Sequence, residues 1–364
     1  MSSLISRHFK PYFETKMKYK GGSSGTPMPG KTIYKMSSNE NPLGTSEKVI
    51  DHVRSLAQDL YLYPDTTDIR LREALEAHYK GSIKKEQFIT GNSGSQILQL
   101  LVQAFINKGD EVIVSSPYFV PYRTFCEWAG ATAIDVPLST PKYRLDVDGI
   151  AKAVTDKTRI IFITSPNNPT GTYVNKSQLE RLLTLVPKDV LVIYDEVYQH
   201  FIREEDYATA DTILENHPNL VGLNSFSKAY GLASMRVGYM YSSKEIADYV
   251  RLICRPFTLN KLSMEAGISA LQDTPFIDQV YHHVQKEAAF LHKGLDDRGI
   301  TYIPTCANFI MFKPPINAST FVIEMTKQGV ILRPLDNYMA PGWVRVSIGT
   351  REANDAFLQA LNVG

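Results

Sequence analysis

The 364-residue sequence predicts an α/β fold, with a three-layer α/β/α large domain on a mostly parallel sheet and a smaller C-terminal α+β domain. Two observations indicate this fold. Amphipathic helical segments alternate with short apolar runs, an order typical of βα units that cover both faces of a parallel sheet. Beyond about residue 255 this alternation gives way to long helical segments and more widely spaced strands. The chain is also long enough for more than one core.

The predicted elements of the large domain follow one another in a regular order. Apolar residues spaced three and four positions apart predict helices at 69–80 and 95–109. Short runs rich in Val, Ile and Leu predict strands at 111–115, 159–164, 190–196 and 219–226. Helices that separate strands in this way allow neighbouring strands to lie parallel.

The C-terminal part begins with a long helical stretch. The pattern predicts helix around 262–298, a strand at 308–313 and a further helix at 318–328, then strands in VILRPL and WVRVSIG and a terminal helix. The N-terminal part contains KGGSSGTPMPGK at 20–31, whose glycine, serine and proline content is typical of a linker. We therefore expect an N-terminal arm at 1–45, a large domain at 46–255 and a small domain at 256–364.

Composition favours a protein that binds small molecules. The net charge is +1 and no basic run of five residues occurs, so neither nucleic acid nor a membrane surface is the expected partner. Three separated cysteines show no zinc or redox spacing, which suits a reducing compartment and predicts no metal site. The sequence shows neither a signal-peptide core nor about 18 consecutive apolar residues. We expect a soluble, cytoplasmic protein.

Polar and aromatic residues follow four of the predicted strands. They are SPYFVPY at 116–122, SPNNPTG at 165–171, DEVYQHF at 195–201 and SFSKAYG at 225–231. Ligands of open α/β sheets bind beyond the carboxyl ends of the strands. One such loop could be turn chemistry alone, but four with different functional groups predict a site.

Lys228 is the candidate for covalent chemistry. Small and apolar neighbours would desolvate its amine and lower its pKa, and a neutral amine forms a Schiff base with a carbonyl. The alternative is an ordinary surface lysine. Ser225, Ser227 and Arg236 lie close in the sequence and offer hydroxyls and a planar fork for a phosphate.

A second phosphate-binding feature precedes the predicted helix at 95–109. GNSGSQ, at 91–96, places small residues where exposed backbone N–H groups and the helix dipole bind an anion. The alternative is an N-cap at Ser93 or Ser95. A phosphate beside a Schiff-base lysine indicates pyridoxal 5'-phosphate.

Pyridoxal phosphate also needs a carboxylate for its ring nitrogen and a flat partner for its ring. Asp195 ends an apolar strand and is the candidate carboxylate, with a helix cap or turn as the alternative. Asn168 and Tyr198 follow neighbouring strands and could bond the ring oxygen. Phe119 or Tyr118 could stack on the ring, although aromatic residues more often pack in a core.

These motifs, in this order, resemble those of the fold type I pyridoxal-phosphate aminotransferases. The resemblance rests on SPNNPTG, DEVY, S-x-S-K with an arginine eight residues after the lysine, and the late WVRVSIG, and it extends from about Ser37 to the C-terminus. It implies that Lys228 is the catalytic residue, which binds the cofactor's aldehyde and moves the proton at the substrate's α-carbon.

The resemblance also implies roles for other residues. Asp195 would pair with the ring nitrogen, Asn168 and Tyr198 would contact the ring oxygen, and Phe119 would stack on the ring. Gly94, Ser95, Gln96, Ser225, Ser227 and Arg236 would hold the phosphate. Tyr63 would reach a phosphate in the neighbouring subunit, so a homodimer with shared active sites is implied.

Within this family, SSNENPLG (37–44), LYPD (62–65) and ANFIMFK (307–313) most resemble the histidinol-phosphate aminotransferases. This similarity implies that Arg333 and Arg345 bind the acidic group of the substrate and that Tyr12 reaches it from the partner subunit. Two guanidiniums suit a phosphate monoester, which carries nearly two negative charges. The implied reaction converts histidinol phosphate and 2-oxoglutarate to imidazole-acetol phosphate and glutamate, in histidine biosynthesis.

Other functions remain open at this stage. An aromatic or broad amino-acid aminotransferase and a phosphothreonine decarboxylase share these motifs. A regulatory effector-binding domain of a transcription factor shares the fold, but the N-terminal segment is short and weakly basic for DNA binding. A non-catalytic homologue would be expected to lose Lys228 or Asp195, and both are present.

Overall fold

The large sheet has seven strands and is mixed but mostly parallel. The structure, a computed structural model, describes residues 30–361. The strand order is β2 (Phe88–Asn92), β8 (Val237–Ser242), β7 (Leu220–Ser225), β6 (Leu191–Asp195), β5 (Thr158–Thr164), β3 (Glu111–Val114) and β4 (Thr132–Asp135). β8 runs antiparallel to both of its neighbours, and the pairs from β7 to β4 are parallel. The carboxyl ends of the parallel strands therefore meet at one edge.

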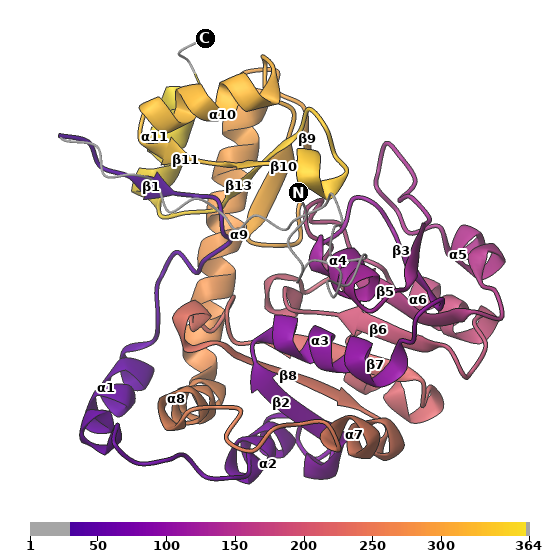
Figure 1. The fold of residues 1–364 in the computed structure, drawn as a ribbon. Helices are drawn as coiled ribbons and strands as arrows, with labels where there is room; N and C mark the ends of the chain where they lie inside the picture. Colours follow the sequence, from indigo (N-terminus) through magenta and orange to yellow (C-terminus); the bar gives the residue numbers. More distant parts are fainter. Residues whose placement is uncertain (1–29, 362–364) are drawn as a thin grey trace, which may run out of the picture.

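Helices cover both faces of this sheet, as predicted (Figure 1). Alternate residues of one strand enter two different cores: Ile161 of β5 packs in one, and Ile160 and Phe162 pack in the other. The first core is covered by α1 (Glu47–Ser55), α2 (Ile69–His78), α5 (Val147–Ala153), α6 (Lys176–Leu185) and α8 (Lys261–Leu271). The second is covered by α3 (Gly94–Phe105), α4 (Pro121–Trp128) and α7 (Lys244–Arg251). The three-layer fold follows from this alternation.

A smaller antiparallel sheet lies in the C-terminal part. Its order is β12 (Arg333–Pro334), β13 (Val344–Ser347), β10 (Phe309–Phe312) and β9 (Tyr302–Ile303). Its core includes residues of α9 (Thr274–Asp296), α10 (Ala318–Lys327) and α11 (Arg351–Ala360). Tyr198 and Ala229, from loops of the large sheet, also pack in this core. The two parts therefore meet beside the loops that follow β6 and β7.

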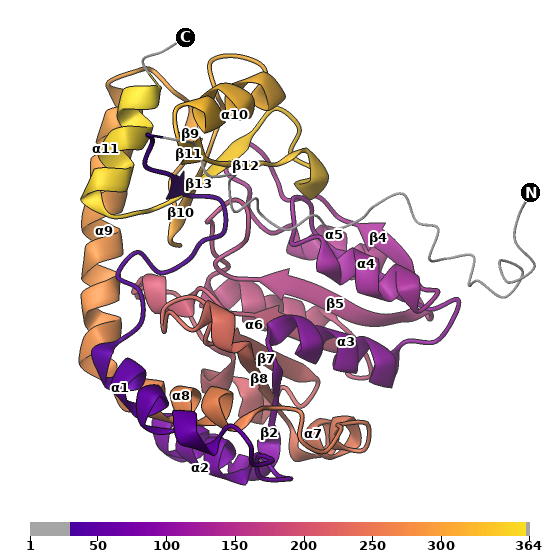
Figure 2. The same cartoon turned by 60° about the vertical axis from the view of Figure 1, so that its left-hand side comes forward.

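The helix expected around 262–298 is two helices, α8 and α9. α8 ends at Leu271 and α9 begins at Thr274, with Pro275 in its first turn. Proline has no N–H to donate and is tolerated in the first turn, so a new helix starts there. α9 then runs along one side of the molecule to the smaller sheet (Figures 1 and 2).

The segment after residue 30 connects both parts. β1 (Tyr34–Lys35) pairs in parallel with β11 (Val330–Ile331), and residues 36–46 run from there to α1 (Figure 1). The predicted division at residues 45 and 255 stays a prediction. No helix within residues 30–361 is long and apolar enough to cross a membrane, and no cluster of His, Cys, Asp or Glu in that range could hold a metal ion.

Candidate active site

A cavity of about 330 Å³ lies where the carboxyl edge of the large sheet meets the smaller sheet and residues 37–40. Twelve of the predicted site residues line it: Gly94, Ser95, Phe119, Asn168, Asp195, Tyr198, Ser225, Ser227, Lys228, Arg236, Arg333 and Arg345. The loops after β2, β3, β5, β6 and β7 thus converge as expected for an open α/β sheet. The volume suits a small-molecule site.

Lys228 is half-buried in this cavity, three residues beyond the end of β7. Its Nζ donates a hydrogen bond to the Ser38 carbonyl oxygen at 3.0 Å and lies 5.7 Å from the centre of the Tyr198 ring. Burial first, and then the charge of Arg345, lower the pKa of Lys228 to about 7. Much of the lysine is therefore a neutral amine at neutral pH, as nucleophilic or basic chemistry requires.

Asp195 ends β6 and is 5% exposed. Its Oδ2 accepts a hydrogen bond from the Tyr122 hydroxyl at 2.5 Å, and its Oδ1 accepts from the Val197 N–H at 3.2 Å. Burial raises the pKa of Asp195 to about 6, while the Tyr122 bond opposes that rise. A cationic ring nitrogen beside this carboxylate would lower the pKa again, so the site suits a protonated pyridine.

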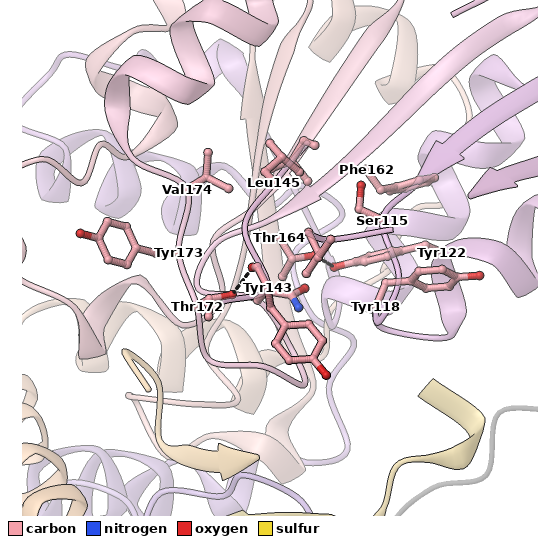
Figure 3. Close-up of a pocket in the computed structure, with 13 residues that line it drawn as sticks. Ser115, Tyr118, Tyr122, Tyr143, Leu145, Phe162, Thr164, Thr172, Tyr173 and Val174 are labelled. Carbon is pink, nitrogen blue, oxygen red and sulfur yellow. Dashed lines mark hydrogen bonds between the residues drawn. The ribbon is translucent and has the colours of Figure 1, made fainter. Parts of the chain in front are cut away.

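Tyr122 also lines a second, much smaller pocket (Figure 3). Its ring stacks on Phe162 with centroids 4.8 Å apart, and its hydroxyl also bonds Thr164 Oγ1 at 2.9 Å. The pocket holds about 20 Å³, room for a single water, and the buried Ser115 Oγ at its wall has no hydrogen-bond partner within residues 30–361. This pocket is too small for a substrate, and the residues that line it pack against Tyr122.

Asn168 and Tyr198 both present donors to the cavity. Arg345 donates a hydrogen bond to Asn168 Oδ1, and Asn39 Nδ2 donates to the Tyr198 hydroxyl at 2.9 Å. Because these acceptor positions are occupied, the Asn168 amide hydrogens and the Tyr198 hydroxyl hydrogen can point to a ligand oxygen. The pair therefore suits the anionic ring oxygen of pyridoxal phosphate.

The phosphate end of the cavity is formed by the start of α3 and the loop after β7. The first N–H groups of a helix have no acceptor within the helix, and those of Gly94 and Ser95 lie at this start. Gly238 of β8 permits the close approach, because a Cβ there would lie 2.3 Å from the Gly94 nitrogen. Ser225 Oγ donates to Ser227 Oγ at 3.0 Å. This cradle fits a phosphate group.

Arg236 lies at the open side of the same cradle. It is exposed, has a φ of 55° and donates to the Ala233 carbonyl at 2.9 Å. Left-handed backbone is uncommon for an arginine. The turn directs the guanidinium towards the cavity, where it can bind an anion.

Two predicted site residues lie elsewhere in the described chain. The side chain of Gln96 faces its own loop, where its Oε1 accepts a hydrogen bond from the Asn92 N–H. Its backbone N–H donates to the Ser93 carbonyl oxygen. Tyr63 lies on the surface, 84% exposed, with its ring 5.2 Å from that of Phe257. Their binding roles stay predictions. Tyr12 lies outside the described residues.

The open choices at individual positions have structural answers. Phe119 lines the large cavity, whereas Tyr118 is buried against the small pocket, so Phe119 is the aromatic residue available to a ligand ring. Ser93 occupies the N-cap position of α3 at φ 78°, but its side chain makes no capping bond to any residue in 30–361. The loop is therefore not an ordinary serine cap.

Sequence reasoning missed Tyr122, Ser38 and Asn39. Tyr122 lies one helical turn after Phe119, and this spacing could have signalled a shared face. Ser38 and Asn39 belong to SSNENPLG, far from the strand-end loops in sequence. The pairing of β1 with β11, together with hydrogen bonds to Ser347 and from Asn308, brings that segment to the cavity.

Family comparison agrees with this geometry. A family model described as aminotransferase class I and II matches residues 31–361. The histidinol-phosphate aminotransferase 1 of Idiomarina loihiensis is 37% identical over 329 residues, which are 90% of this chain and 89% of the relative. The histidinol-phosphate aminotransferase 2 of Carboxydothermus hydrogenoformans is 36% identical over 91% of both chains.

Solved structures share the fold. A histidinol-phosphate aminotransferase from Sinorhizobium meliloti, in complex with pyridoxal-5'-phosphate, superposes with a TM-score of 0.86 at 22% identity, over 97% of this chain and 96% of that one. An aspartate aminotransferase from Thermotoga maritima gives 0.80 at 26% identity, over 92% and 93%. The chain therefore belongs to the class I and II aminotransferases and is a pyridoxal-phosphate-dependent transaminase with the type I fold.

Proposed function

We propose that the protein is a histidinol-phosphate aminotransferase of histidine biosynthesis, which uses glutamate and 2-oxoglutarate as the other substrate pair. The observation that carries this proposal is a cavity with an excess of positive charge. Its charged lining residues are Lys228, Arg236, Arg333 and Arg345 against Glu40 and Asp195. Only some of this charge is needed for the cofactor phosphate, so the remainder favours an acidic substrate. The names of the relatives point to the same substrate.

Arg345 and Arg333 are the residues that would bind the acidic group. They are 3% and 7% exposed. Arg345 bonds two neutral oxygens, Asn168 Oδ1 and the Ser37 carbonyl, and its Nε has no partner within residues 30–361. A buried guanidinium whose charge is not neutralised favours an anionic ligand. A phosphate monoester or a carboxylate of glutamate would supply the missing charge.

The cofactor, when bound, supplies an aldehyde that condenses with amines and a ring that draws electrons from the substrate's α-carbon. Lys228 Nζ, neutral near pH 7, can accept the α-carbon proton and return it. Asp195 stabilises a proton on the ring nitrogen, and Tyr122 holds that carboxylate in place. Asn168 and Tyr198 would donate to the ring oxygen, and Phe119 would stack on the ring.

The proposal includes a cytoplasmic homodimer in which Tyr63 and Tyr12 act in the partner's site. The exposure of Tyr63 supports this part, because a large aromatic side chain on the surface suits an interface. Gln96 and the loop at 93–95 are proposed to complete the phosphate site of each subunit.

Substrate identity is tested by the visible absorption of the holoenzyme without keto acid. Addition of histidinol phosphate should remove the absorption band of the bound cofactor at much lower concentration than phenylalanine does. An equal response to phenylalanine would indicate an aromatic aminotransferase, and carbon dioxide release from phosphothreonine would indicate a decarboxylase. The Lys228→Ala protein should fold but show no transamination, and near-normal turnover would exclude the mechanism.

Arg333→Gln separates acidic-group recognition from the rest of the chemistry. A charge-assisted hydrogen bond contributes about 1.5–3 kcal/mol, so kcat/KM for histidinol phosphate should fall roughly 10- to 150-fold. The value for phenylalanine, whose acidic group is a singly charged carboxylate, should fall less. The control is Arg181→Gln, because Arg181 pairs with Asp148 on the exposed side of α6 and does not line the cavity. An equal loss for both substrates would contradict the assignment of Arg333.

A further inference from the structure

Asn39 is a fully buried side chain that touches the active site from outside the strand-end loops. It lies in the segment between β1 and α1, and its Nδ2 donates to the Tyr198 hydroxyl at 2.9 Å. This hydroxyl has no other hydrogen-bond partner within residues 30–361. The Asn39–Tyr198 bond therefore decides how the tyrosine uses its single hydrogen.

The smaller sheet fixes the orientation of Asn39. Its N–H donates to Ser347 Oγ at 2.8 Å, and Ser347 Oγ donates to Asn39 Oδ1 at 3.1 Å. Asn308 Nδ2 donates to the Asn39 carbonyl at 3.1 Å. The φ of Asn39 is 54°, a left-handed conformation that asparagine tolerates better than most residues. The bond from Ser347 to Oδ1 thus holds the side-chain amide with its Nδ2 facing Tyr198, and the two backbone bonds, to Ser347 of β13 and from Asn308 just before β10, hold the segment that carries it.

A tyrosine hydroxyl has one hydrogen to donate and can also accept. When Asn39 Nδ2 donates to it, the hydroxyl hydrogen must point elsewhere. Tyr198 lines the cavity together with Lys228 and Asn168. The hydrogen is then available to an acceptor within the cavity.

We infer that Asn39 is a positioning residue: it occupies the acceptor side of the Tyr198 hydroxyl and so directs the hydroxyl hydrogen to the ring oxygen of the cofactor. This inference rests on the proposed contact between Tyr198 and that oxygen. The segment between β1 and α1 would then help to set the pKa of the bound cofactor. The smaller sheet would contribute as well, because Ser347 orients Asn39.

The test is a pH titration of the visible absorption band of the holoenzyme in the absence of substrate. A hydrogen bond from Tyr198 stabilises the deprotonated ring oxygen, so its loss should raise the titration midpoint. Tyr198→Phe sets the size of this effect, about one pH unit for one hydrogen bond. Asn39→Asp should raise the midpoint too, because its carboxylate can only accept and would take the Tyr198 hydrogen.

The double variant isolates this effect from the added charge. In the Tyr198→Phe background, Asn39→Asp should shift the midpoint much less than it does in the original protein, because no Tyr198 hydroxyl remains to redirect. The charged groups facing Tyr198 are Lys228, Asp195 and Arg345. All three are unchanged in these variants, so they contribute equally to each titration.

Asn354→Ala is the matched control. Asn354 is equally buried and bonds Glu287 and Gly349 away from the cavity, so this variant should lower stability and leave the midpoint unchanged. If Asn39→Asp does not fold, Ser347→Ala replaces it and should give a smaller rise that disappears in the Tyr198→Phe background.

The outcomes distinguish the inference from the proposed function. No shift in Tyr198→Phe would overturn the contact between Tyr198 and the ring oxygen, and the inference with it. Two outcomes would overturn the role of Asn39 alone, provided that Tyr198→Phe shifts the midpoint. One is that the shifts add in the double variant. The other is that Asn39→Asp, or Ser347→Ala in its place, gives no shift.

Discussion

At the scale of single residues, burial sets the protonation of the groups that react. Lys228 has a pKa of about 7, lowered first by burial and then by the charge of Arg345. The neutral amine is the nucleophile, so cofactor loading should speed up as pH rises towards 7 and level off above it. Below the midpoint the rate should fall about tenfold per pH unit.

Loading is measured by mixing the cofactor-free protein with pyridoxal phosphate and following the visible band. The Lys228→Ala protein reports any non-covalent contribution. A rate that keeps rising to about pH 10, where an ordinary lysine titrates, would contradict the lowered pKa.

Tyr122 keeps the carboxylate of Asp195 ionised. Tyr122→Phe removes a hydrogen bond to a charged group, which contributes about 1.5–3 kcal/mol, or about 1–2 pH units. Asp195 must be ionised to pair with the ring nitrogen. Its pKa is about 6 without the cofactor and lower beside a cationic ring nitrogen, so activity falls as pH drops through that lowered value. The variant should move the acid limb of the kcat/KM profile upwards by that amount.

The Phe162 stack remains in Tyr122→Phe, so the fold should be retained. Tyr173→Phe is the control, because Tyr173 also donates to an aspartate, Asp206, at 2.8 Å, but outside the cavity. It should leave the profile in place. An unmoved acid limb in Tyr122→Phe would show that the bond does not tune Asp195.

At the scale of elements, the sequence predicted those whose pattern is strong. The strands expected at 159–164 and 219–226 are β5 and β7, and their short, almost completely buried runs between helices explain the success. β8 was not predicted, although it is the antiparallel strand beside the phosphate cradle. Its sequence, VGYMYS, begins directly after Arg236, and that stretch was interpreted only as part of the lysine and phosphate motif.

The residues that pair across distant segments could not be predicted from local pattern. Twelve site residues followed from strand ends and resemblance, and they converge in the structure. Asn39 and Ser38 reach the cavity because β1 pairs with β11, almost 300 residues later. Such pairing leaves no periodic signal near either segment.

β8 also carries a prediction of its own. Gly238→Ala would place a Cβ 2.3 Å from the Gly94 nitrogen and 2.5 Å from the Ser93 carbonyl carbon, so the start of α3 must move. The φ of Gly238 is not positive, so alanine causes no backbone strain. We expect at least a tenfold weaker affinity for pyridoxal phosphate and a smaller effect on the thermal unfolding of the cofactor-free protein. Unchanged affinity would show that the cradle does not need this close approach.

At the scale of the whole molecule, one exposed apolar surface lies apart from the cavity. It consists of Leu60, Tyr61, Leu62, Tyr63 and Phe257, each at least 43% exposed. Several large apolar side chains gathered on a surface mark an interaction site more often than chance exposure. The proposed homodimer would cover this surface.

Leu60→Asp tests the dimer, because Leu60 is 69% exposed, makes no contribution to the cavity lining and would place a charge in the proposed interface. Sedimentation equilibrium should give twice the chain mass for the original protein and a large monomer fraction for the variant. Cofactor affinity and kcat should fall together with the dimer fraction, since Tyr63 is proposed to act in the partner's site. Leu185→Asp, at the exposed end of α6 and outside this surface, is the control and should stay dimeric. A fully active monomer would mean that each cavity is complete within one chain, and that Tyr63 binds no group in a neighbouring subunit.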